Sequence, residues 1–146
     1  MAHEDAPHYS RKHPSGERPD QRLAEAVRKK AVRSTIACSA AFEIVSESGA
    51  EPSRVGRTID LLEVRLVRCQ LGLFGYPSKE GGKALEPAAT VSPELEKAIR
   101  EKLADGRLAC ADAWAIAEAL GLRRMEVSSA AEKLGVRIKP CQLGAF

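Results

Sequence analysis

The chain has 146 residues, of which 44% are hydrophobic, 4% aromatic and 29% charged, and its formal net charge is +3. This length is that of about one domain, or of two very small ones, and the composition is ordinary for a soluble globular protein. No apolar run approaches the roughly 18 residues of a membrane span, and four cysteines are too few for a disulfide scaffold, so we expect a reduced, cytoplasmic protein.

The first 20 residues differ in composition from the rest of the chain. They contain all three histidines, many charged residues and few apolar ones. Such a segment buries too little apolar surface to order itself, and it lacks the apolar core of a secretory signal. We therefore expect residues 1–20 to form a disordered tail.

The remainder of the chain reads as two copies of one sequence. Adding 72 to the residue number aligns residues 21–74 with 93–146 without a gap, and 18 of these 54 positions are identical. Both copies end in Cys-Gln-Leu-Gly, a variable residue and Phe, at 69–74 and 141–146. Self-alignment of this kind is typical of duplicated supersecondary units. The sequence therefore predicts a tandem duplication.

Each repeat is predicted to contain a helix, a short strand, two helices and a strand. The predicted parts are repeat one over 21–76, a linker rich in turn formers over 77–91, and repeat two over 92–146. In repeat one, apolar periodicity and turn residues place the elements at 23–32, 35–38, 41–48, 53–62 and 64–68. In repeat two, Ser92 and Pro93 start the first helix, and the elements lie at 93–103, 107–110, 113–120, 124–134 and 136–139.

The second and third helices of each repeat are joined by a few residues that include a glycine. A small residue, a turn glycine and a buried aliphatic residue stand at Ala117, Gly121 and Val127. The same positions of repeat one hold Val45, Gly49 and Val55. This spacing resembles that of the helix-turn-helix superfamily, and the order of elements resembles a reduced winged helix. The resemblance implies a mostly α protein of two tandem helix-turn-helix (winged-helix-like) repeats with short strands.

In this superfamily the last helix of the motif lies in the DNA major groove, with its first residues at the base edges. The resemblance therefore implies a DNA-binding protein, a transcriptional regulator whose two reader helices contact two half-sites about 34 Å apart. The candidate DNA-contacting residues lie at the starts of the third helices and on the strands that follow: Ser53, Arg54, Arg57, Arg65 and Arg68, and Arg123, Arg124, Ser128, Arg137 and Lys139.

The distribution of charge leaves a second function open. Residues 1–37 hold 8 basic and 5 acidic side chains, which leaves 15 of each sign in residues 38–146. The folded part is thus near neutral, whereas a DNA-binding domain usually has a basic stripe. The arginines would then form a solvated helix face. Because helix-turn-helix units also serve as interaction modules, the alternative is a protein-interaction or accessory module with a protein partner.

The four cysteines occupy equivalent places in the two repeats. Cys38 and Cys110 are predicted to end the short strands, and Cys69 and Cys141 the later ones. If these strands pair, each repeat brings two thiols together. Three interpretations stay open: small buried thiols that fill the core, a thiol–disulfide switch, and a metal or iron–sulfur site. A site shared by all four would require the repeats to meet at their strand ends.

Two further expectations concern the tails of the repeats and enzymatic activity. The apolar residues of the shared tail motif are predicted to cap the core: Leu71, Phe74, Leu143 and Phe146. No histidine lies in the predicted folded part, and neither a Gly-rich phosphate loop nor a nucleophile elbow occurs in the sequence. We therefore expect a protein without enzymatic activity and without a cofactor.

Overall fold

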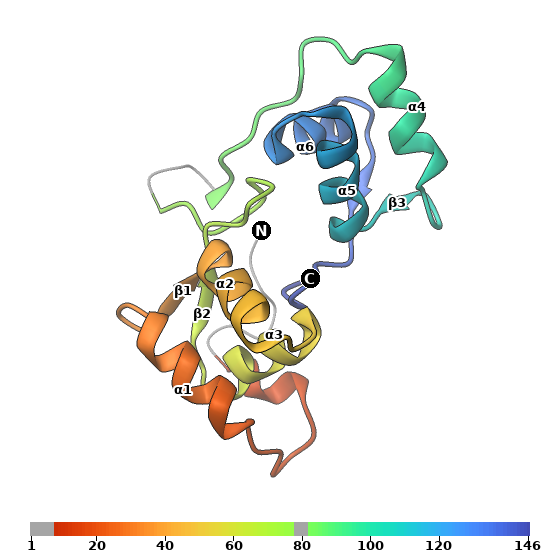
Figure 1. Ribbon diagram of the computed structural model, residues 1–146. Coiled ribbons are helices and arrows are strands. Elements are labelled where there is room, and N and C mark those ends of the chain that lie inside the picture. Colours follow the sequence, from red (N-terminus) through yellow and green to blue (C-terminus); the bar gives the residue numbers. More distant parts are fainter. Residues whose placement is uncertain (1–7, 78–81) are drawn as a thin grey trace.

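The computed structural model describes residues 8–77 and 82–146, which fold into a mostly helical protein with a few short strands. The first half contains α1 (Gln21–Lys30), β1 (Thr35–Ala37), α2 (Cys38–Ser48), α3 (Pro52–Leu61) and β2 (Arg65–Val67). The second half contains α4 (Pro93–Glu101), β3 (Arg107–Leu108), α5 (Cys110–Leu120), α6 (Arg124–Lys133) and β4 (Arg137–Ile138). A 3-10 helix, η1 (Tyr9–Lys12), precedes α1, and Figure 1 shows the halves as two lobes. Residues 1–7 of the predicted tail and 78–81 of the predicted linker lie outside the described residues.

The element bounds of the two halves follow the 72-residue register. Adding 72 to the bounds of α2 and α3 gives those of α5 and α6, and β3 and β4 begin 72 residues after β1 and β2. The local signals act as expected. The Ser92 hydroxyl accepts the amide of Leu95 at 3.2 Å at the start of α4. Gly49 and Gly121 end α2 and α5 with φ of 72° and 67°, a left-handed conformation that favours glycine.

The strands pair within each half, which is the condition for bringing the two thiols of each repeat together. β1 pairs with β2 and β3 with β4, and both pairs are parallel. Two helices carry the chain from the first strand back to the start of the second, so both strands run in the same direction. Neither two-stranded sheet therefore contains the β-hairpin that forms the wing of a winged helix. The parallel pairing does place the residues that follow both strands at one end of the sheet.

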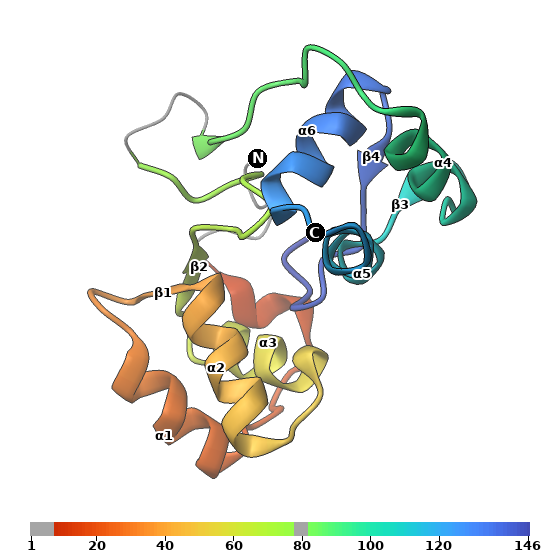
Figure 2. The same cartoon turned by 45° about the horizontal axis from the view of Figure 1, so that its top comes forward.

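Each half has its own hydrophobic core, and the two halves exchange their tail leucines. Leu71, which is 0% exposed, packs in the core formed by α4, α5 and α6, and Leu143, which is 3% exposed, packs in the core formed by α1, α2 and α3. Figures 1 and 2 show the chain after β2 passing beside α6, and the C-terminal segment returning to α3. The tails thus cap a core, as expected, but each caps the core of the other half.

Aromatic contacts across the junction join equivalent positions. Phe42 packs against Trp114 with ring centroids 4.4 Å apart, and Phe74 meets Phe146 edge to face at 5.8 Å. Both pairs are separated by 72 residues. In a two-fold symmetric interface, residues near the axis meet their own equivalents, and every contact between i and j has a matching contact between j and i. The halves therefore associate like the subunits of a symmetric dimer, joined in one chain.

Among the described residues, no helix combines the length and the apolar character that crossing a bilayer requires.

Candidate functional site

The outward side of α3 presents Ser53, Arg54 and Arg57. Val55 and Ile59, both buried, fix α3 on the core of the first half. The helical period then leaves Ser53, Arg54 and Arg57 exposed on the opposite side of the helix. The side chains of Arg54 and Arg57 are 61% and 55% exposed. α2, the turn at Gly49 and α3 thus form two consecutive helices joined by a short turn, and the start of α3 is accessible and basic.

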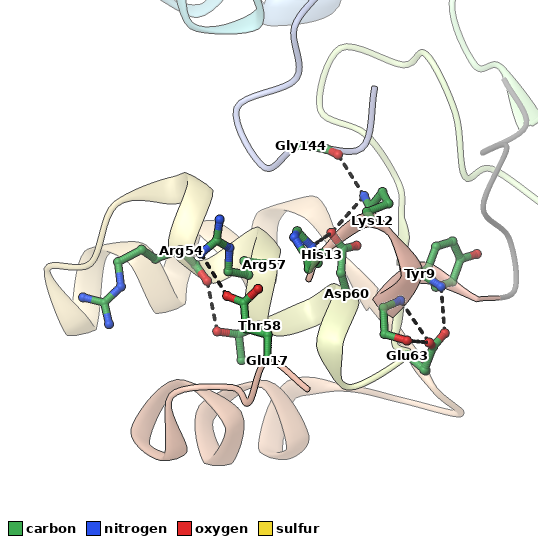
Figure 3. Close-up of polar contacts among 11 residues, drawn as sticks. Tyr9, Lys12, His13, Glu17, Arg54, Arg57, Thr58, Asp60, Glu63 and Gly144 are labelled. Carbon is green, nitrogen blue, oxygen red and sulfur yellow. Dashed lines mark hydrogen bonds and ion pairs between the residues drawn. The ribbon is translucent and has the colours of Figure 1, made fainter. Parts of the chain in front are cut away.

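Residues 8–20 pack across α3, so the prediction of a disordered tail is wrong for this part of the chain. Figure 3 shows three of the ion pairs: Arg57–Glu17 at 2.9 Å, His13–Asp60 at 2.9 Å and Lys12–Asp60 at 2.8 Å. A fourth pair joins Arg54 to Asp20 at 3.0 Å. Tyr9 is buried. One buried aromatic ring and several specific charge partners order this segment, although its average composition is that of disorder.

Glu63 holds the start of the segment through backbone hydrogen bonds. Its carboxylate accepts the amide of Tyr9 at 2.8 Å and the amide of Ser10 at 2.9 Å, and it also accepts the Ser10 hydroxyl. Burial raises the pKa of Glu63, but the hydrogen bonds from Ser10 and Tyr9 together hold that pKa below its ordinary value. Because the folded-state pKa is lowered, this contribution to stability is present above the ordinary glutamate pKa and is lost as the pH falls through the lowered value.

We therefore expect the amide resonances of Tyr9 and Ser10 to shift with the ionisation of Glu63 in an acid titration followed by NMR. In Glu63→Gln this transition disappears, and the free energy of unfolding falls by no more than about 1 kcal/mol, because the carboxylate is largely solvated. A transition that persists unchanged in Glu63→Gln would show that another group anchors the segment.

The corresponding side of α6 is covered, which corrects two of the predicted DNA contacts. Ser128 is 1% exposed, and its hydroxyl donates to the carbonyl oxygen of Leu71 at 2.5 Å. Arg124 lies 3.6 Å from the centre of the Trp114 ring and donates to the side-chain oxygen of Gln70. The tail of the first half occupies this side of α6, so Ser128 and Arg124 are not available to base edges.

The linker covers α6 further. The amide of Ala88 donates to the carbonyl oxygen of Ser129 at 3.0 Å, and Lys83 pairs with Glu132 at 2.7 Å. The positions equivalent to Ser53, Arg54 and Arg57 are Met125, Glu126 and Ser129. The α6 surface therefore lacks the arginines of the α3 surface.

The remaining predicted contacts are exposed. Arg123 is 84% exposed and pairs with Glu126 at 3.0 Å. Four more of these residues are exposed to solvent: Arg65, Arg68, Arg137 and Lys139. Arg65 is the first residue of β2 and Arg137 the first residue of β4. The guanidinium of Arg68 lies 6.0 Å from the centre of the Tyr76 ring. These residues are spread over both halves of the chain.

The four cysteines meet where the halves join. Cys38 and Cys110 are the first residues of α2 and α5, not the last residues of the strands as predicted, while Cys69 and Cys141 follow β2 and β4. All four are free thiols, and all four line one cavity of about 10 Å³ at the junction. The condition for a shared site, that the halves meet at their strand ends, is fulfilled.

Burial governs the ionisation of these thiols. It raises the pKa of Cys38 to about 12 and that of Cys110 to about 11, and it raises the pKa of Cys69 as well. The thiols of Cys38, Cys69 and Cys110 are thus protonated at neutral pH and react slowly with solutes. Within residues 8–77 and 82–146, no three His, Cys, Asp or Glu side chains stand in a ready-made arrangement for a metal ion.

Sequence reasoning did not single out Gly56, which takes part in the junction. Gly56 and Ser128 are equivalent positions, and each lies beneath a tail of the other half. The sequence signal that could have predicted this contact is a small residue, glycine or serine, at the equivalent position of α3 and α6.

Comparison of the chain with protein-family models, with curated proteins and with solved structures finds no match. The assignment of a function rests on the geometry of α3 and of the junction.

Proposed function

We propose that the protein binds double-stranded DNA through α3 of its first half and acts as a transcriptional regulator. The observation that carries this proposal is the exposed start of α3, where Arg54 and Arg57 project from a helix that the Gly49 turn holds against α2. A helix fits the major groove, and arginine pairs bidentately with guanine or holds a phosphate. Ser53 lies beside them and adds a hydroxyl that bonds to a base or to a phosphate.

The acidic residues of the N-terminal segment do not prevent this binding. Arg54 and Arg57 pair with Asp20 and Glu17 at the protein surface. Exposed ion pairs contribute about 0–1 kcal/mol each, so DNA phosphates can replace these carboxylates at low cost. The expected complex has one reader helix per chain, because the tail of the first half and the linker cover α6.

A second candidate function follows from that covered helix. In the second half, the surface of α6 binds protein segments, namely the tail after β2 and the linker. This use of the motif supports a protein-interaction or accessory module on the same fold.

Fluorescence anisotropy with a labelled duplex of mixed sequence tests the proposal. The wild-type chain should bind, with an affinity that falls steeply as salt rises. The double variant Arg54→Ala/Arg57→Ala should lose at least about tenfold in affinity and reduce the salt slope by about 2, since each phosphate contact contributes about 0.9.

The matched control is Arg123→Ala, which removes a still more exposed arginine at the start of α6 and should stay within about twofold of the wild type. The proposal that α3 binds DNA would be contradicted if the wild type did not bind at low salt, or if Arg123→Ala lost as much affinity as the double variant. A stable protein partner that binds the double variant as well as the wild type would favour the accessory module.

A further inference from the structure

A cavity of about 60 Å³, partly open to solvent, lies in the first half where α3 and β2 meet η1 and the two tails. Its wall is mainly apolar and includes Ile59, Val64, Leu66, Phe74, Leu143 and Phe146. Among the described residues that line it, two are charged, Asp60 and Arg65. Ser53, Arg54 and Arg57 do not line it, so it is distinct from the proposed DNA-binding surface. An apolar concavity with a few polar groups is the usual form of a small-molecule site.

Asp60 supplies a carboxylate that the protein satisfies only in part. Its side chain is 12% exposed, and Lys12 and His13 contact its Oδ2 atom at 2.8 Å and 2.9 Å (Figure 3). Among the described residues, no hydrogen bond or ion pair involves its Oδ1 atom. A nearly buried carboxylate oxygen is stabilised by a hydrogen-bond donor. Oδ1 is therefore a recognition point for an N–H group of a ligand.

Arg65 supplies the opposite charge. It is the exposed first residue of β2, and it forms no ion pair with Asp60 or with any other part of the chain that the structure describes. The backbone amide of Arg65 donates to the carbonyl oxygen of Ser34 at 2.8 Å. Because successive amides of a strand point to opposite sides, the amide of Leu66 points away from β1. A guanidinium and a backbone amide are both donors that bind carboxylates.

We propose that this cavity binds a free α-amino acid with an aliphatic side chain. The ammonium group pairs with Asp60, the carboxylate with Arg65 and the amide of Leu66, and the side chain packs on the apolar wall. Because Asp60 and Arg65 line one cavity without pairing with each other, a zwitterion matches both charges, whereas an anion or a cation matches one. A cavity of about 60 Å³ has room for roughly four to six water-sized groups, which suits the side chain of valine or leucine.

The second half does not repeat this combination of groups. The position equivalent to Asp60 is Glu132, whose side chain is 37% exposed and pairs with Lys83 at 2.7 Å. The position equivalent to Arg65 is Arg137, which is also exposed and also begins a strand. We therefore expect one site per chain, and Arg137 is the matched control for Arg65.

Titration of the full, isotope-labelled chain with L-valine, followed by amide NMR, tests this inference. Saturable shifts are expected for Gly56, Leu66 and Ala145, which line the cavity. Two analogues keep the side chain of valine and lose one charge: 3-methylbutanoate lacks the ammonium group, and 2-methylpropylamine lacks the carboxylate. Each should bind at least about tenfold more weakly than valine, because one charge-assisted hydrogen bond is lost. Glycine, which has no side chain to pack on the apolar wall, should also bind more weakly than valine.

Two variants separate this site from unspecific binding. Arg65→Gln should weaken valine binding at least about tenfold, whereas Arg137→Gln should stay within about twofold of the wild type. Ala145→Leu places a larger side chain in the cavity and should also prevent binding. The amide resonances of Tyr9 and Ser10 show whether the N-terminal segment stays in place in each variant. The inference would be overturned by absence of saturable shifts with valine and leucine, by equal binding of either analogue, or by undiminished binding in both Arg65→Gln and Ala145→Leu.

The proposed amino-acid site and the proposed DNA binding are independent of each other. Arg54→Ala/Arg57→Ala should bind valine as the wild type does, so loss of DNA binding by this variant does not bear on the cavity.

Discussion

Leu71→Ala should destabilise the second half of the protein, although residue 71 belongs to the first half in sequence. Leu71 is fully buried in the core of α4, α5 and α6. Truncation of such a leucine costs about 2–5 kcal/mol, because apolar contact is lost and a cavity remains. Hydrogen exchange measured by mass spectrometry should therefore show a larger loss of amide protection in α5 and α6 than in α2 and α3.

Leu143→Ala is the matched variant with the opposite expected result. Leu143 packs in the core of α1, α2 and α3, so its truncation should reduce protection mainly in the first half. If each variant instead loosens the half that contains it in sequence, the tails are not exchanged.

Gly56→Ala should destabilise the protein, although the same change in most helix interiors is stabilising. An alanine normally gains about 1 kcal/mol over glycine in a helix. A Cβ atom at residue 56 would lie 1.8 Å from the carbonyl oxygen of Leu143 and 2.6 Å from its carbonyl carbon. The C-terminal tail would have to move away from α3, and we expect a net loss of about 1–3 kcal/mol, as for other overpacked sites.

Chemical denaturation measures this loss as a lower midpoint at an unchanged slope. Ser53→Ala, on the exposed side of the same helix, is the control and should stay within about 0.5 kcal/mol of the wild type. A gain of stability in Gly56→Ala would mean that the tail does not lie on α3.

The features set by local interactions could be predicted from the sequence. Ser92 caps α4 and Gly49 ends α2 because capping and left-handed turns depend on a few neighbouring residues. The pairing of the strands did not follow from such local signals and was implied only by the resemblance to a winged helix. The internal repeat fixed where each element would lie, and the helices and strands appear in that order.

The exchange of the tails could not be predicted in this way. Leu71 removes the same apolar area from water whether it enters its own core or that of the other half, so hydrophobicity alone does not distinguish the two arrangements. The burial of Ser128 and the gathering of the four cysteines both depend on that exchange. Composition likewise did not reveal the order of residues 8–20, which depends on Tyr9 and on the carboxylate of Glu63.

We propose that DNA binds at the start of α3, whereas the tail of the first half and the linker cover the corresponding surface of α6. Titration of the isotope-labelled protein with duplex DNA, followed by amide NMR, tests it most directly. The account predicts shifts for the amides of Ser53, Arg54 and Arg57 and for the segment around Glu17 and Asp20, which DNA displaces. The amides at the start of α6, from Arg124 to Ser128, should keep their positions. Shifts centred on α6, or no shift anywhere at low salt, would contradict the account.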